Sequence, residues 1–271
     1  MKLWRFLWNI VVLLIIAAMA GCSSEFNLAT RQQETLIYGS EKEVKIGEAV
    51  DKQVQKQFDI IYDVDLNERV ERIYKKLTAV ADRQDILYFI RVIDLKPEDR
   101  EDYEDPVVNA FAAPGGYMYV FKDLIDFAES DDELAGVIAH EIGHVTARHG
   151  IKRLQYSYGA MALQILSTQA NAEVARGTNL ALTSLLLEYS QKDEFEADRL
   201  GIRYMKAAGY DPQGVVTFLK KLRTKQQEDK LRQFSYWRTH PHLPERISAA
   251  NIEATGTMEF KDYLNIIGSD D

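Results

Sequence analysis

The stretch VIAHEIGHVTARHG, residues 137–150, constrains the fold of this 271-residue chain more than any other part of its sequence. His140 and His144 are four residues apart, so on an α-helix they project from the same face, about one turn apart. The apolar residues around them recur at helical spacing and predict a buried helix: Leu134, Val137, Ile138, Ile142 and Val145. A buried imidazole without a partner is costly, so the fold must supply partners for both histidines.

A zinc ion would satisfy both histidines, because two imidazoles at this spacing can occupy two corners of a Zn²⁺ tetrahedron. Glu141 directly follows His140, and in the H-E-x-x-H arrangement its carboxylate can take a proton from a water molecule at the metal. The competing interpretation is a helix whose histidines are only packed or solvated. We prefer a metal site with His140 and His144 as ligands and Glu141 as general base.

His149, the third histidine of the stretch, does not fit the same metal if the helix continues. It comes nine residues after His140, which is roughly 180° around the helix. We therefore expect His149 to lie outside the metal site and Gly150 to end the helix. The third ligand must come from another part of the chain.

The best source of that ligand is YSQKDEFEADRLG, residues 189–201. Glu194 and Asp198 are four residues apart on a predicted helix, so both can face the zinc helix. Glu194 would be a ligand, and Asp198 would accept a hydrogen bond from a ligand imidazole. Glu196 is rotated by about 200° from Glu194 and should face away. The alternative is a charged, solvated helix face.

Hydrophobic periodicity predicts a mostly helical α+β fold. The expected helical segments are 41–58, 67–81, 130–150, a region reaching 169, 179–208 after a loop at 171–177, one starting at 212, and 244–253. The expected strands are 86–93, 107–111 and 117–121, the last two forming a hairpin around 112–116. We therefore expect a small three-stranded antiparallel sheet within a single domain spanning residues 40–271.

The N-terminus has a different character. Lys2 and Arg5 precede an unbroken apolar run at residues 10–20. This pattern predicts a signal peptide over residues 1–21. The run is short for a membrane span of roughly 20 residues, although a retained anchor is the alternative. Residues 22–39 are polar and mixed, and we expect them to form a tether.

Cys22 is the only cysteine, so it cannot form an internal disulfide. Its place directly after Ala20 and Gly21 resembles the lipobox of bacterial lipoproteins. The resemblance implies cleavage before Cys22, lipidation of its thiol and, because Ser23 follows, an outer-membrane location facing the periplasm. A free thiol is the alternative.

The charge balance excludes one class of partner. Removal of residues 1–21 takes away two basic residues and no acidic one, which moves the formal net charge from -9 to -11. Such a surface repels phosphates, so we expect no nucleic-acid partner.

Four motifs in order carry a family resemblance: NAFAAPGG, HEIGH, EFEAD and HPHLPERI, between residues 107 and 247. Together they resemble the zinc metallopeptidase family that includes the HtpX membrane proteases, the CAAX prenyl proteases and small periplasmic lipoprotein proteases. The resemblance implies a zincin-like fold with one zinc per chain. It makes His140, His144 and Glu194 the ligands, Glu141 the general base and Asp198 the carboxylate behind a ligand.

The resemblance also implies roles near His240 and Arg246. His240 could donate a hydrogen bond to the oxyanion or cap the zinc in a resting state, and Arg246 could pair with Asp198 or steady the substrate. His242 competes with His240 for the first role. An arginine early in a helix usually lies on the surface.

These features predict a zinc-dependent endopeptidase that hydrolyses unfolded or misassembled cell-envelope proteins. The alternative is a periplasmic chaperone or assembly factor whose zinc site is closed or structural. The chain has no further apolar run near 20 residues, which argues against a transmembrane substrate chamber.

An extended substrate could add a strand to the edge of the sheet. Either strand of the predicted hairpin could supply that edge, and Asn109 would then contact the substrate. Equally, the hairpin could serve only for packing.

Overall fold

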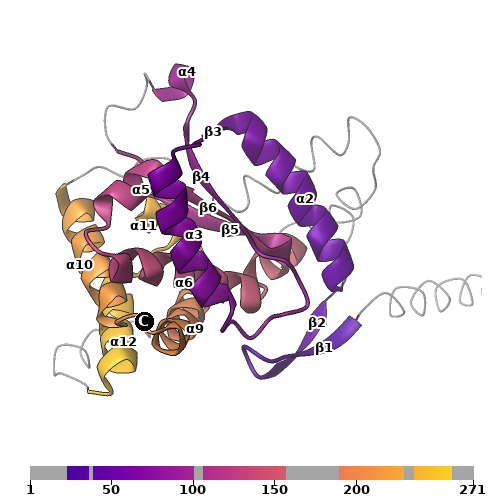
Figure 1. Ribbon diagram of the computed structural model, residues 1–271. Helices are drawn as coiled ribbons and strands as arrows, with labels where there is room; N and C mark the ends of the chain where they lie inside the picture. The colour runs from indigo at the N-terminus through magenta and orange to yellow at the C-terminus, as the bar shows by residue number, and fades with distance from the viewer. Residues whose placement is uncertain (1–22, 37–38, 101–105, 157–188, 229–234, 258–271) are drawn as a thin grey trace, which may run out of the picture.

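The computed structural model describes residues 23–36, 39–100, 106–156, 189–228 and 235–257. Within these ranges Figure 1 shows a small sheet among helices, which confirms the mostly helical α+β class. The strands are β1 (Ser23–Asn27), β2 (Gln32–Leu36), β3 (Phe58–Ile60), β4 (Phe89–Leu95), β5 (Ala110–Ala113) and β6 (Tyr117–Phe121). The helices are α2 (Ser40–Gln57), α3 (Val64–Thr78), α4 (Pro97–Arg100), the 3₁₀ helix η1 (Pro114–Gly116), α5 (Lys122–Phe127), α6 (Asp131–Thr146), α9 (Gln191–Ala208), α10 (Gln213–Glu228), α11 (Tyr236–Thr239) and α12 (Leu243–Thr255).

The larger sheet has four strands in the order β3-β4-β6-β5, one more than the sequence predicts. The sequence does not reveal β3, because its three residues directly follow α2 and continue the apolar spacing of that helix. β5 and β6 form the expected antiparallel hairpin, but β4 and β6 run parallel. The sheet is therefore mixed, with β5 at one edge and β6 in the interior.

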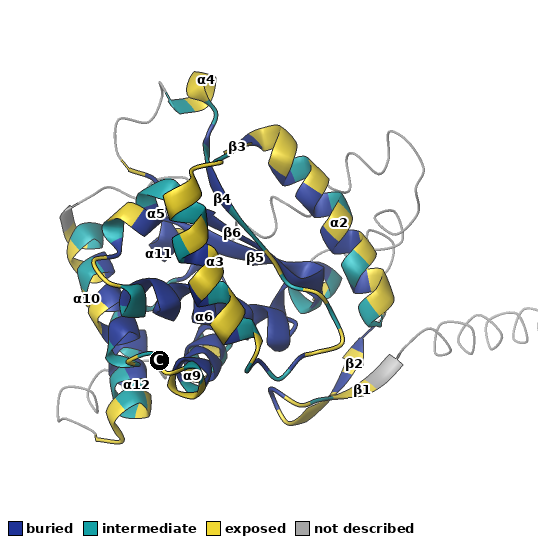
Figure 2. Cartoon of the chain, viewed as in Figure 1, coloured by how far each residue is buried: buried dark blue, intermediate teal, exposed yellow. Residues whose placement is uncertain are grey.

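Both faces of β6 are covered, and all five of its residues are buried. Met118 and Val120 pack with α3 and α6 in one apolar cluster, whereas Tyr119 and Phe121 pack with α2 in another. Successive side chains of a strand point to opposite faces, so an unbroken apolar run fits a strand covered on both sides. Figure 2 shows this buried centre, with exposed residues on the outer faces of α2 and α3.

The central helix α6 is well capped at its start and ends earlier than expected. The Ser130 side chain accepts a hydrogen bond from the Glu133 backbone N–H (3.1 Å), as a capping residue does. Three acidic residues in the first turn lie at the positive end of the helix dipole, and their negative charges stabilise the helix. The helix ends at Thr146, and Arg148 then turns the chain with a φ of 60°. Gly150 therefore does not end α6; it lies in a further helical segment over 149–156.

Two glycines let α6 and α9 approach each other closely. A Cβ atom on Gly143 would lie 2.7 Å from the carbonyl oxygen of Ala197, and one on Gly201 would lie 3.0 Å from the carbonyl carbon of Ala139. No side chain fits at either position without a shift of one helix. The close packing brings the carboxylates of α9 to the histidines of α6.

Part of the expected tether, residues 22–39, forms a hairpin that contacts the domain. β1 and β2 pair antiparallel along their whole length. The Asn27 side-chain amide donates to the carbonyl oxygen of Thr146 at the end of α6 (3.0 Å), and Ala29 and Leu36 are buried. The composition of residues 22–39 does not predict this hairpin, because polar contacts hold it to the domain as much as buried apolar residues do.

Some predictions lie outside the described residues. They are the signal peptide with Cys22, the helical region from 157 to 169, the loop at 171–177 and the first part of the 179–208 helix. Among the residues that the structure does describe, no helix combines the length and apolar character needed to cross a membrane.

Candidate metal centre

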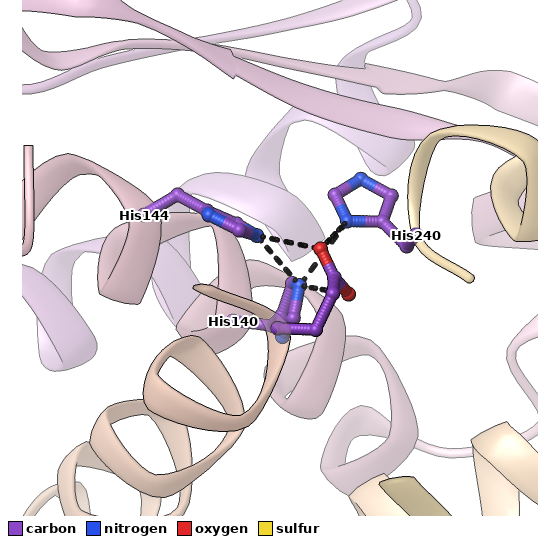
Figure 3. Close-up of side chains that lie close together, drawn as sticks. His140, His144 and His240 are labelled. Carbon is purple, nitrogen blue, oxygen red and sulfur yellow. Dashed lines mark hydrogen bonds and ion pairs between the residues drawn. The ribbon is translucent and has the colours of Figure 1, made fainter. Parts of the chain in front are cut away.

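Three histidines and one glutamate from distant parts of the chain meet in the interior. They are His140 and His144 on α6, Glu194 on α9 and His240 directly after α11, and one atom of each lies within 4.8 Å of the others. Figure 3 shows the three imidazoles converging on one point. The Nε2 atoms of His140 and His144 are 2.9 Å apart, and Glu194 Oε1 lies 3.4 Å from His144 Nε2. All four side chains are buried.

Neighbouring groups favour the forms of His140, His144 and Glu194 that can bind a metal. Asp198 Oδ1 lies 2.7 Å from His140 Nδ1 and accepts its proton in a hydrogen bond, so the lone pair of His140 Nε2 faces the cluster. Burial lowers the pKa of His144 well below its usual value, which keeps that imidazole neutral. Burial alone would raise the pKa of Glu194, but Arg246 and the nearby histidines outweigh it and hold the pKa well below its usual value. A neutral His144 imidazole and an ionised Glu194 carboxylate are the forms of these side chains that bind zinc.

Arg246 lies buried behind this cluster and bridges two carboxylates of α9. Its Nε donates to Asp198 Oδ2 (2.8 Å) and its Nη2 to Asp198 Oδ1 (2.7 Å). Its Nη1 also forms an ion pair with Glu194 Oε2 at 2.5 Å. Only 1% of the residue is exposed, so the alternative of a surface arginine is wrong. Arg246 thus pairs with Asp198, one of the two contacts considered for it.

Glu141 lies beside the cluster with an unengaged carboxylate. Within the described part of the chain, neither of its oxygens has a hydrogen-bond partner, although Oε1 is 3.5 Å from His240 Nε2. Burial raises its pKa. A buried carboxylate without a donor is costly. A water molecule at the metal would supply the missing donor, so Glu141 also fits a zinc site.

Of the two competing histidines near the C-terminus, His240 is the one at the cluster. Its Nδ1 is 3.1 Å from Glu194 Oε1 and 3.3 Å from His140 Nε2. Its ring stacks on Tyr236, with centroids 4.3 Å apart. His242 is only partly buried and lies outside this group. His240 therefore offers a fourth possible ligand atom to the group.

The sheet edge near the centre is β5, because β6 is paired on both sides. Asn109, the residue before β5, is fully buried; its Oδ1 accepts from Ala110 N (2.9 Å) and from the hydroxyl of Thr239 (3.3 Å). The carbonyl oxygen of Ala110 faces His240 Nε2 at 3.4 Å. Of the two strands considered for substrate binding, β5 is the one at an edge of the described sheet, and all four of its residues are buried.

Sequence reasoning missed two contacts of His144. Its Nδ1 lies 2.8 Å from Nδ1 of His149, whose Nε2 is 3.3 Å from Glu196 Oε2. Glu196 lies outside the group of possible ligands, as its rotation from Glu194 predicts, but it contacts His149, because the chain turns at Arg148 and does not continue α6. The ring of Tyr189 also stacks on His144, with centroids 4.0 Å apart. Nothing in the sequence marked Tyr189 beyond its closeness to the Glu194 motif.

A helix pair that presents two histidines and a glutamate, with a second glutamate beside them, defines a zinc metallopeptidase site. The chain belongs to peptidase family M48, whose family model matches residues 66–254. This confirms the resemblance carried by the four motifs.

Three relatives illustrate the similarity. The chain is 28% identical over 244 residues to the beta-barrel assembly-enhancing protease of Yersinia pestis, covering 83% of this chain and 47% of the relative. It is 30% identical over 180 residues to the mitochondrial metalloendopeptidase OMA1 of Schizosaccharomyces pombe, covering 66% of this chain and 50% of the relative. It is 30% identical over 191 residues to the metalloprotease LoiP of Escherichia coli, covering 66% and 72%. The chain thus spans about half the length of the first two.

Proposed function

We propose that this chain is a zinc-dependent endopeptidase that hydrolyses peptide bonds in unfolded or misassembled proteins of the bacterial cell envelope. One observation carries the proposal: the group formed by His140, His144 and Glu194, with the Glu141 carboxylate beside it, which has no hydrogen-bond partner among the described residues. A group of three protein ligands with a neighbouring glutamate favours catalysis over a structural role, because structural zinc sites mostly use cysteine. The names of the relatives support proteolysis and, for one of them, a link to β-barrel assembly.

The chemistry follows from the positions of these residues. Bound zinc, held by His140, His144 and Glu194, would polarise the peptide carbonyl and lower the pKa of a water molecule. Glu141 would take the proton of the attacking water and deliver it to the leaving amine. Its raised pKa suits this task, since a general base works best when its pKa approaches the working pH. Asp198 would keep the His140 ring oriented through the Nδ1 hydrogen bond.

The substrate would bind as an extended strand along β5. Strand addition holds a polypeptide through its main chain and makes few demands on sequence, as an enzyme for unfolded proteins requires. The Ala110 carbonyl faces His240, and the Ala110 N–H is bonded to Asn109. Substrate binding would therefore require His240 to move away, and Asn109 would lie next to the bound strand.

We also propose a location at the outer membrane, facing the periplasm. Residues 1–21 would be removed as a signal peptide, and Cys22 would carry the lipid anchor. The sequence of this segment and the name of the Yersinia relative support the location. The acidic chain would act on polypeptides, with no nucleic-acid partner.

The fourth possible ligand, His240, favours a second candidate function. His240 makes the ligand group four-membered and fully buried, as in a structural site. A chain with such a site could bind unfolded envelope proteins as a chaperone or assembly factor without cleaving them.

The Glu141→Gln variant separates the two functions. We expect it to bind one zinc per chain, as the wild type does, and to cleave unfolded casein at least about 10²-fold more slowly, because only the proton-transfer group is lost. Zinc content by mass spectrometry and release of labelled casein fragments measure both effects. The matched control is Glu98→Gln, on the exposed surface of α4, which should cleave like the wild type. A wild type that binds zinc but cleaves no casein would favour the chaperone.

A further inference from the structure

The end of α6 brings a fourth histidine, His149, against the metal centre. After Thr146 the chain turns through Arg148, at a φ of 60°, and the following helical segment starts at His149. The turn returns the ring of His149 to that of His144, with Nδ1 atoms 2.8 Å apart and ring centroids 5.0 Å apart. His149 is only 2% exposed, so its nitrogens depend on protein partners.

The contact between the two Nδ1 atoms fixes which nitrogen of each ring carries a proton. His144 Nε2 faces the cluster, 2.9 Å from His140 Nε2, and a nitrogen that binds a metal carries no proton. Neutral His144 must then carry its proton on Nδ1 and donate it to Nδ1 of His149. His149, in turn, carries its proton on Nε2.

The other ring nitrogen of His149, Nε2, lies near two carboxylates of α9. It lies 3.3 Å from Glu196 Oε2 and 3.5 Å from Asp193 Oδ1. Glu196 is therefore placed to accept the His149 Nε2 proton. The donors run in one direction, from His144 to His149 to Glu196.

This arrangement parallels the one behind the other histidine of α6. His140 Nδ1 donates directly to the carboxylate of Asp198, which Arg246 holds in place. The Nδ1 atom of His144 instead reaches a carboxylate through a second imidazole, that of His149. A hydrogen bond at the ring nitrogen that does not bind the metal sets the orientation and the basicity of a ligand imidazole.

We propose that His149 is the positioning residue of His144: it accepts the Nδ1 proton and holds the ring so that Nε2 points at the zinc, while Glu196 fixes His149. This inference rests on the proposed function, because it takes His144 as a zinc ligand. It assigns to His149 a role in the centre without making it a ligand.

Two variants of the full chain with side chains of similar size test the proposal. In His149→Asn, the Oδ1 atom can stand where Nδ1 stands and accept the proton; in His149→Leu, no acceptor remains. We expect the leucine variant to bind zinc about 10- to 100-fold more weakly than the wild type and the asparagine variant to stay close to it. Competition with a chromophoric chelator measures zinc affinity without reference to cleavage. Far-UV circular dichroism of the zinc-free proteins checks that both variants fold.

A second measurement needs no variant. Long-range ¹H–¹⁵N correlation spectra of the zinc-loaded wild type report which nitrogen of each histidine carries a proton. We expect His144 to be protonated on Nδ1 and His149 on Nε2. The proposal is overturned if His149 carries its proton on Nδ1, or if both variants bind zinc with equal affinity.

His144→Ala separates this failure from a failure of the proposed function. If the wild type binds no zinc, or the alanine variant binds it equally well, the zinc centre itself is wrong. If the alanine variant loses zinc while His149→Leu binds it like the wild type, only the role of His149 is wrong.

Discussion

A buried cation balances the buried anions of the centre. Burial disfavours the charged forms of both Glu194 and Asp198, yet the pKa of each is held below its usual value by Arg246 and nearby histidines. The guanidinium is suited to this position, since its fork donates to both oxygens of one carboxylate and still reaches another. The charge of Arg246 therefore stabilises the ionised forms of Glu194 and Asp198.

Replacing Arg246 should accordingly destabilise the zinc-free protein strongly. Arg246→Met leaves two buried carboxylates without their cation, and loss of one partner of a buried pair costs about 3–5 kcal/mol. Urea unfolding of the zinc-free protein measures the loss. We expect saturating zinc to recover part of it, because zinc is a cation beside Glu194. Arg72→Met, at a half-exposed ion pair with Asp131, should cost less than about 1 kcal/mol; an equal cost for the two variants would contradict this account.

At the scale of elements, side chains from outside α6 cap its C-terminal end. The last carbonyl groups of a helix have no partner within it. Asn27 of β1 donates to the carbonyl of Thr146, Arg83 donates to that of Val145 (3.3 Å), and Lys152 donates to that of Ala147 (2.7 Å). The N-terminal hairpin thus helps to hold the helix that carries the metal ligands.

Loss of the hairpin's contact should loosen that end of the helix. Asn27→Ala removes the donor to Thr146 and should cost about 0.5–1.5 kcal/mol of unfolding free energy. Hydrogen exchange should become faster at the last turn of α6 and stay unchanged in α10. The matched change Leu28→Ala, at a side chain that is 66% exposed, should have little effect on either measurement. If the two variants behave alike, the hairpin does not support α6.

The contacts of helices and strands can be predicted from the sequence only where they follow from a local pattern. The spacing of His140 and His144, and of Glu194 and Asp198, predicts helix faces correctly because those contacts repeat every turn. His149 is different: its position depends on a left-handed turn at Arg148, a conformation that arginine rarely adopts and that no local pattern announces. The parallel pairing of β4 with β6 depends on contacts between distant residues, which strand patterns do not encode.

At the scale of the whole molecule, the centre lies where three segments meet. His140 is 58 positions from Asp198 and 100 from His240 along the chain. The sheet lies on one side of this junction, since β5 contacts His240 through the Ala110 carbonyl. If the substrate binds along β5, as proposed, it and His240 in its present position would exclude each other. Under this proposal, access to the centre would require the segment between α11 and α12 to shift.

This exclusion predicts the effect of His240→Ala on cleavage. If His240 caps the centre at rest, its removal should speed casein cleavage, by about tenfold or more where the open state is populated at about 10% or less. His242→Asn is the matched control, because asparagine tolerates the left-handed backbone found there (φ 62°), and it should cleave like the wild type. Initial rates at saturating zinc measure both variants. A fall of His240→Ala to the rate of Glu141→Gln would instead make His240 a donor to the oxyanion, needed in the reaction itself.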